Sequence, residues 1–149
     1  MSSGVQVDES CISTYQALQT SKQLRHIVFK LSDDNKSIIV DTTKPVDKDA
    51  DPTAEYEEFV KSVPQDECRW FVYDFEYTHT DESTGHQGQR NKVLFISWAP
   101  DGAKIKPKMI YASSREGLRR KLTGIQAEIQ GTDLSEIDHE AVLNKINRK

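Results

Sequence analysis

The chain has 149 residues and a mass of 17.0 kDa, which suits one ordinary domain and is too small for two. Charged residues make up 30% of it, and no apolar run approaches the length that crosses a bilayer, so the composition favours a globular protein. The net charge of −4 is unevenly distributed: residues 104–121 carry seven basic side chains and one acidic side chain, a local charge of +6 that leaves −10 elsewhere. This asymmetry predicts a surface that attracts an acidic partner.

The N-terminal region predicts a short tail followed by a helix. Residues 1–4 are small and polar, and we expect them to form a flexible tail. Asp8 or Ser10 then caps a helix that ends near residue 21, because apolar residues recur at spacings of three. The tail has neither the basic start nor the apolar block of a secretory signal, which favours a cytoplasmic protein.

A hairpin and a second helix are expected next. The β-branched runs 25–31 and 37–42 flank a cluster of turn-forming residues, which is typical of a hairpin. A polar loop follows, and Pro52 stands at the first position of a helix that ends before Pro64.

The strongest strand signals are the aromatic and β-branched runs 68–78 and 91–99, which we expect at the centre of the sheet. The segment between them is predicted to be a polar loop. A basic helix follows over residues 105–122, then a short strand over 127–132, and finally a helix capped by Asp138. This order predicts one mixed sheet with helices packed on its faces, an α/β (α+β) fold in a single domain.

The basic helix has two different sides. At about 100° per residue, the core-facing stripe collects five residues: Ile110, Tyr111, Ser114, Gly117 and Leu118. The opposite side carries Lys108, Met109, Arg115, Arg119 and Arg120. Charge alone favours a solvated face. However, Glu116 is the only acidic partner on the helix, and a Met beside Arg is a composition favoured at protein contacts.

Signatures of catalysis and of bound groups are missing. The sequence has no phosphate-binding glycine loop and no GxSxG nucleophile turn. Cys11 and Cys68 lack a CxxC spacing, so we expect two reduced, buried thiols. His79 and His86 lie in the expected loop, which is a poor place for a metal site. The sequence therefore predicts no enzyme, no cofactor and no metal.

Several blocks in the same order resemble the actin-depolymerising factor/cofilin family. The blocks are SGV at the N-terminus, YDFEY (73–77), SWAPD (97–101), KMIYASS (108–114), LRRKLTGI (118–125) and GTDLSEI (131–137). They extend over nearly the whole chain. The resemblance implies a five-stranded mixed sheet flanked by helices over residues 5–149, and a protein that binds actin monomers and filaments, prefers ADP-actin, and severs and depolymerises filaments without catalysis.

The resemblance also implies two contact surfaces. The first, used on monomers and filaments, would comprise Ser3, Gly4, Val5, Lys108, Met109, Arg115, Arg119 and Arg120. The second, used on filaments alone, would comprise Arg90, Lys92, Lys145 and Arg148. Ser3 matches a position that is phosphorylated in family members, where added negative charge would oppose an acidic partner. Gly117 stands where relatives usually have Ala.

Other functions remain open at this point. A basic helix could bind anionic phosphoinositide lipids, and a related actin-binding domain could sequester or cap actin without severing. Specific nucleic-acid binding is not expected, because no aromatic residues interleave the basic ones. We expect a monomer in the cytoplasm, at the actin cytoskeleton. The basic run that some family members use for import into the nucleus is missing, so nuclear localisation is left open.

Overall fold

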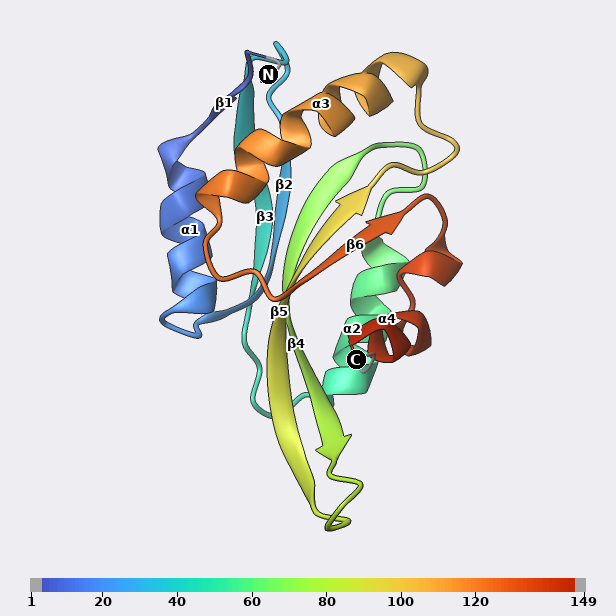
Figure 1. Ribbon diagram of the computed structural model, residues 1–149. Coiled ribbons are helices and arrows are strands. Elements are labelled where there is room, and N and C mark those ends of the chain that lie inside the picture. Colours follow the sequence, from blue (N-terminus) through green and yellow to red (C-terminus); the bar gives the residue numbers. More distant parts are fainter. Residues whose placement is uncertain (1–3, 147–149) are drawn as a thin grey trace.

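The structure is a computed structural model that describes residues 4–146. Its elements in chain order are β1 (Gln6–Val7), α1 (Glu9–Gln19), β2 (Leu24–Leu31), β3 (Ser37–Pro45), α2 (Pro52–Ser62), β4 (Arg69–Thr80), β5 (Gln87–Trp98), α3 (Ile105–Lys121), β6 (Ala127–Gly131), the 3₁₀ helix η1 (Leu134–Glu136) and α4 (His139–Ile146). The strands form one sheet in the order β1-β3-β2-β4-β5-β6 (Figure 1). The pairs β1–β3 and β5–β6 are parallel and the others antiparallel, so the predicted mixed sheet is confirmed.

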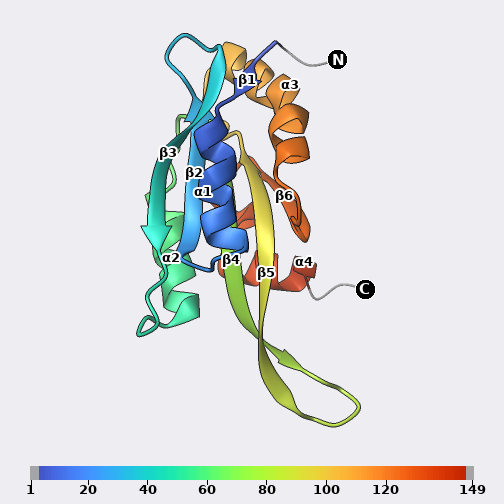
Figure 2. The same ribbon diagram turned by 90° about the vertical axis from the view of Figure 1, so that its left-hand side faces the viewer.

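Helices cover both faces of this sheet (Figures 1 and 2). Helices α1 and α3 pack on one face against a core that includes Trp70 and Val72, and α2 and α4 pack on the other against Phe71 and Tyr73. Neighbouring residues of β4 thus enter two different cores. Both faces of the central strands are buried, so the first half of β4 and the last half of β5 are nearly continuous apolar runs. These runs explain why the two strands gave the strongest strand signals. None of the helices within residues 4–146 is long and apolar enough to cross a membrane.

The sheet has one strand more than the five that were predicted. Gln6 and Val7 pair in parallel with Ser37 and Ile38 at the start of β3. The Gln6 N–H donates to the Lys36 carbonyl at 2.9 Å. A strand of two residues is too short for any alternation of apolar and polar side chains, so the sequence pattern could not reveal it.

The hairpin of β4 and β5 is longer than predicted, because half of the expected polar loop, residues 79, 80 and 87–90, is paired strand. Pairing continues to Thr80 and Gln87, and the turn itself spans only residues 81–86. The Asp81 side chain accepts from the Ser83 hydroxyl at 2.7 Å and the Ser83 N–H at 2.9 Å, and these donors hold the pKa of its carboxyl below its usual range. Both faces of the arms are largely exposed near the turn, so the segment lacks the apolar alternation that marks a strand.

The predicted helix cap at Asp138 is confirmed, and Asp51 caps α2 just before Pro52. The Asp51 carboxylate accepts from the Ala54 N–H at 3.1 Å, and Asp138 accepts from the Ala141 N–H at 2.8 Å. Asp8 occupies the capping position of α1, but its side chain makes no capping hydrogen bond there. The 3₁₀ helix η1 was not predicted.

The two cysteines are free thiols buried in the core beneath α1 and α3, as expected. The Cys11 Sγ donates to the Ile38 carbonyl at 3.3 Å. Burial raises the pKa of the Cys11 thiol to about 11, and it also raises the pKa of Cys68.

Candidate functional site

Helix α3 is fixed to the sheet by the stripe that the sequence placed toward the core. Tyr111 and Leu118 are buried, and the Leu31 N–H donates to the Tyr111 hydroxyl at 3.0 Å. Just beyond the helix, the Tyr15 hydroxyl of α1 donates to the Thr123 carbonyl at 2.7 Å, and burial raises the pKa of Tyr15 to about 12. The helix is therefore anchored near its middle and near its C-terminal end, and its outer side has a defined orientation.

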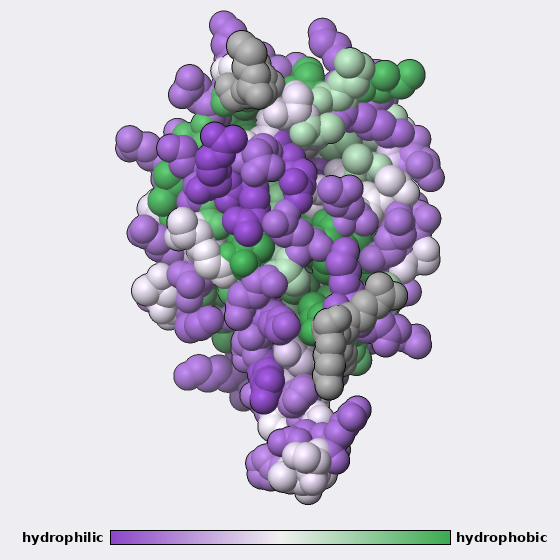
Figure 3. Space-filling model, in the orientation of Figure 1, coloured by the Kyte–Doolittle hydropathy of each residue, from purple (hydrophilic) through white to green (hydrophobic). Residues whose placement is uncertain are grey.

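The first half of α3 exposes two large apolar side chains. Among the described residues, the exposed large hydrophobic side chains are Ile105, 77% exposed, and Met109, 67% exposed. They lie one helical turn apart, on the same side of the helix. Figure 3 shows the resulting apolar surface at the end of the molecule where α3 begins. The exposure of Met109 is as predicted, whereas Ile105 was missed because it was considered only as the start of the helix, although its spacing of four from Met109 was the available signal.

The arginines on the second half of α3 are held by a carboxylate that sequence analysis did not find. Both Arg115 and Arg119 pair with Glu128 of β6, the latter with 3.0 Å between Nε and Oε2. Their side chains are only 22% and 27% exposed. Arg115 also donates to the Ser97 hydroxyl at 3.1 Å. The expectation that Glu116 is the only acidic partner is wrong, because the parallel pairing of β6 with β5 brings Glu128 beneath α3.

Other cations around α3 are more open to a partner. No ion pair between residues 4–146 involves five basic residues of this region, which are Lys104, Lys106, Lys108, Arg120 and Lys121. All but Lys108 are exposed, and the Lys108 ammonium donates to the Asp101 carbonyl at 3.3 Å. The helix surface is defined here by six residues: Ile105, Lys108, Met109, Arg115, Arg119 and Arg120.

The N-terminal segment lies next to this surface. Gly4 is exposed with φ of +83°, and Val5 packs against the core beneath α3. Strand β1 and α3 are neighbours (Figure 1). The fold therefore brings Gly4 and Val5 close to the helix surface, while Ser3 lies outside the described residues.

The second predicted group forms at the other end of the molecule, where α4 lies beside the long hairpin (Figure 1). Arg90 and Lys92 alternate along β5 opposite Tyr77 and Phe75. The Lys92 ammonium donates to the Ile146 carbonyl at the end of α4 at 3.5 Å, where a cation is favoured by the helix dipole. Arg90 and Lys145 are exposed. These three basic residues, Arg90, Lys92 and Lys145, are defined as the hairpin surface, and Arg148 lies outside the described residues.

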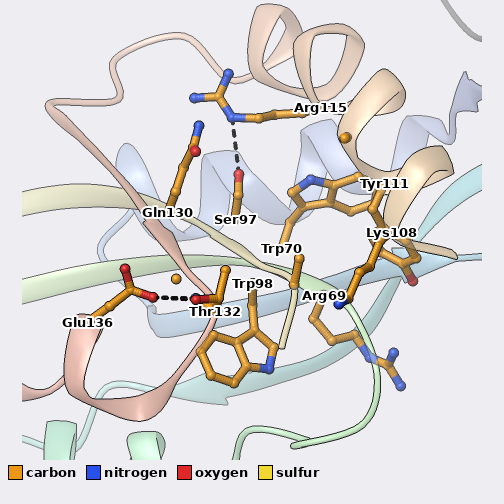
Figure 4. Close-up of a pocket in the computed structure, with 13 residues that line it drawn as sticks. Arg69, Trp70, Ser97, Trp98, Lys108, Tyr111, Arg115, Gln130, Thr132 and Glu136 are labelled. Atoms are coloured by element: carbon orange, nitrogen blue, oxygen red, sulfur yellow. Dashed lines mark hydrogen bonds between the residues drawn. The ribbon is translucent and has the colours of Figure 1, made fainter. Parts of the chain in front are cut away.

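A pocket of about 450 Å³ lies between α3 and the ends of β4, β5 and β6 (Figure 4). Trp70, Trp98 and Tyr111 line it, together with the basic side chains of Lys108 and Arg115. At its edge the Thr132 N–H and hydroxyl both donate to Glu136 at 2.7 Å, and they hold the pKa of the Glu136 carboxyl below its usual range. No local sequence pattern reveals this pocket, because residues from several elements far apart in the chain form it.

Metal chemistry has no candidate site in the part of the chain that the structure describes, where no group of three or more His, Cys, Asp or Glu residues could hold an ion. The two groups of basic residues and the exposed apolar side chains instead have the chemistry of contact surfaces for an acidic macromolecule.

Comparison with known proteins agrees with this chemistry. The Cofilin/tropomyosin-type actin-binding protein family matches residues 4–147. A cofilin of Cryptococcus neoformans var. neoformans is 46% identical over 149 residues, covering all of both chains. The crystal structure of a Streptomyces griseoflavus cofilin is 48% identical with a TM-score of 0.81, and covers 97% of this chain and 98% of the other. Plasmodium berghei actin depolymerization factor 2 is 28% identical with a TM-score of 0.84, covering 99% and 100%.

Proposed function

This chain belongs to the cofilin family of actin-binding proteins, and from that premise we propose that its helix surface contacts both actin monomers and filaments, while its hairpin surface contacts filaments alone. The function of the chain is actin binding and filament depolymerisation, without catalysis. The proposal assigns this function to particular residues and extends it to severing and to a preference for ADP-actin.

The observation that carries the proposal is the exposed pair Ile105 and Met109, which lies beside three lysines. These lysines, Lys104, Lys106 and Lys108, form no ion pair among the described residues. Exposed apolar groups gain free energy when a partner covers them, at about 25 cal/mol per Å² of buried apolar area. Cations around them steer an acidic partner and fix its orientation. Gly4 and Val5 extend the same contact beside α3.

Two surfaces at different ends of one small protein allow it to touch two neighbouring filament subunits. Binding then favours the filament geometry in which both contacts are satisfied, and the population of subunits shifts toward that geometry. A boundary between bound and bare segments joins two geometries and is mechanically weak, which would lead to severing without any covalent step.

The test of the helix surface uses the double variant Arg119→Ala with Arg120→Ala. We expect loss of cosedimentation with filaments and of monomer binding, with an unchanged folded state by circular dichroism.

The matched double variant Arg90→Ala with Lys92→Ala tests the hairpin surface and should weaken filament binding while leaving monomer binding intact. Equal loss of both activities in this second variant would contradict the assignment of two surfaces.

Severing separates this proposal from a domain that only sequesters or caps actin. Fluorescence microscopy of immobilised filaments should show breaks within filaments at partial occupancy. Shortening from the ends alone would support the alternative, a domain that sequesters or caps actin.

The preference for ADP-actin can be measured in the same assay, in which the protein should bind ADP filaments more tightly than ATP or ADP-phosphate filaments.

Regulation follows from the same charges. A phosphate on Ser3 adds about −1.5 to −2 charge, and residues 4 and 5 lie beside the helix surface, so phosphorylation would oppose an acidic partner. Phosphoinositide headgroups would compete for Lys104, Lys106, Lys108 and Arg120. The expected state is a monomer at the cytoplasmic actin cytoskeleton.

A further inference from the structure

The β4–β5 hairpin leaves the sheet at a defined rung, formed by Asp74 and Val93. Pairing of β2 with β4 ends at His26 and Tyr73, and pairing of β5 with β6 begins at Leu94. Beyond these positions no other strand within residues 4–146 pairs with either arm, and the hairpin projects from the body of the molecule (Figures 1 and 2). Its direction must therefore be fixed by groups other than the backbone ladder of neighbouring strands.

Side chains hold this rung on both sides. On the β6 side, the Gln126 N–H donates to the Val93 carbonyl and the Val93 N–H donates to the Gln126 side chain, both at 2.9 Å. On the β2 side, the Arg25 Nη1 donates to the Asp74 carbonyl at 2.9 Å. Across the hairpin, the Asn91 amide donates to the Asp74 carboxylate at 3.2 Å. Asn91 lies between Arg90 and Lys92, so this contact leads directly to the hairpin surface.

Arg25 reaches the rung because it sits at an irregularity in β2. Leu24 and His26 pair with the consecutive residues Pro45 and Lys44 of β3, so Arg25 is the extra residue of a β-bulge. A bulge changes the direction of a side chain relative to the regular alternation of a strand. Here it lets one guanidinium contact β4 and also α2.

The Arg25 guanidinium joins three elements in a buried setting. Its Nε lies 3.1 Å from the Glu55 carboxylate of α2, and its Nη2 lies 3.6 Å from the Glu76 carboxylate on the hairpin arm. The side chains of Arg25 and Glu55 are 6% and 4% exposed. Glu55 accepts no hydrogen bond from the described residues, so Arg25 is the charge that compensates this buried carboxylate.

We propose that Arg25 is a positioning residue for the filament contact: by linking α2 to β4 where the sheet ends, it fixes the direction in which the hairpin presents Arg90 and Lys92. This inference rests on the proposed role of the hairpin surface. The planar guanidinium donates one hydrogen bond to the Asp74 carbonyl and at the same time places its charge within 4 Å of both carboxylates, an arrangement that the compact ammonium of a lysine cannot reproduce.

The test variant is Arg25→Lys, which keeps the charge and removes the fork. We expect affinity for filaments to fall about tenfold while affinity for monomers stays within about twofold. A second variant, Arg25→Gln with Glu55→Gln, removes the buried cation and a buried anion together, and should give the same split without leaving Glu55 as an unpaired charge. The matched control is Arg69→Lys, because Arg69 also contacts two carboxylates but lies at the opposite end of β4.

A direct readout of direction accompanies the binding assays. Spin labels are placed at Ser83→Cys in the hairpin turn and Glu58→Cys on α2. With Arg25 intact, the distances between the two labels should have a narrow distribution. This distribution should broaden when Arg25→Lys is added and should stay narrow when Arg69→Lys is added. An unchanged distribution, or equal loss of filament and monomer binding, would overturn the positioning role. If instead Arg90→Ala with Lys92→Ala leaves filament binding intact, the hairpin surface itself is wrong, and the label distances still report whether Arg25 fixes the hairpin.

Discussion

Helix α3 and the β4–β5 hairpin both carry basic side chains, but the molecule holds them by different means. Leu118 and Tyr111 fix α3 against the core, and Glu128 orients two of its arginines. The hairpin leaves the sheet after its Asp74–Val93 rung, and a few polar side chains hold its base. A partner therefore meets a preformed surface on α3, whereas the direction of the hairpin depends on a small number of contacts.

The largest loss of stability is expected when a buried side chain that anchors α3 to the core is truncated. Leu118 is fully buried, so Leu118→Ala should lower the free energy of unfolding by about 2–5 kcal/mol, measured by urea denaturation. Arg90→Ala, on the exposed hairpin, should change it by less than about 0.5 kcal/mol. Similar losses in both variants would contradict the difference in anchoring.

The stability of the protein should also depend on pH, because His26 is buried. His26 packs against Phe59 and Tyr73, and burial, aided by the charge of Lys44, lowers its pKa from 6.5 to about 4. Between these values the unfolded chain binds a proton that the folded chain does not, so stability falls as pH decreases from 6.5 to 4, by at most about 3 kcal/mol. Thermal melts over this pH range should show that the melting temperature of His26→Gln depends less on pH than that of the parent protein. The control His86→Gln, in the exposed turn, should show the same pH dependence as the parent.

A smaller change tests the carboxylate beneath α3. Glu128→Gln removes the charge that pairs with Arg115 and Arg119, and because this carboxylate is 37% exposed, we expect a loss of about 1 kcal/mol that shrinks at high salt. Glu116→Gln, whose side chain is 66% exposed, should cost less than about 0.5 kcal/mol. A cost for Glu128→Gln that does not depend on salt would argue against an electrostatic role.

The smallest expected effect is a gain in stability and not a loss. Among the described residues, a Cβ at Gly117 would meet no atom within 4 Å apart from its chain neighbours and the backbone of its own helix, so no close packing requires glycine there. Gly117→Ala should raise the free energy of unfolding by about 0.5–1 kcal/mol through helix propensity, and make α3 still firmer. Gly124→Ala is the contrasting variant, since Gly124 has φ of +92° and a Cβ there would lie 2.8 Å from the Gln19 amide nitrogen; it should destabilise the protein.

The local patterns that predicted α3 and the central strands depend on neighbours in the sequence, which explains their success. The period of a helix placed Tyr111 and Leu118 inside and Met109 outside, as the structure has them. The pairing of Glu128 with two arginines depends on which strand lies beside β5, and no local pattern contains that information. The length of the hairpin was missed for another reason: where both faces of a ribbon meet water, paired strand and loop have the same composition.

The burial of both cysteines has a practical consequence for measuring motion. Burial raises the pKa of the Cys11 thiol to about 11, so the thiol is protonated at neutral pH, and the core shields it from reagents. Cys68 is also buried, with its pKa raised. A cysteine introduced into the exposed turn at residues 81–86 would thus react selectively with a maleimide dye in the otherwise unaltered chain. The labelled variant, with both native cysteines kept, can then report hairpin movement by fluorescence, in solution and on its partner.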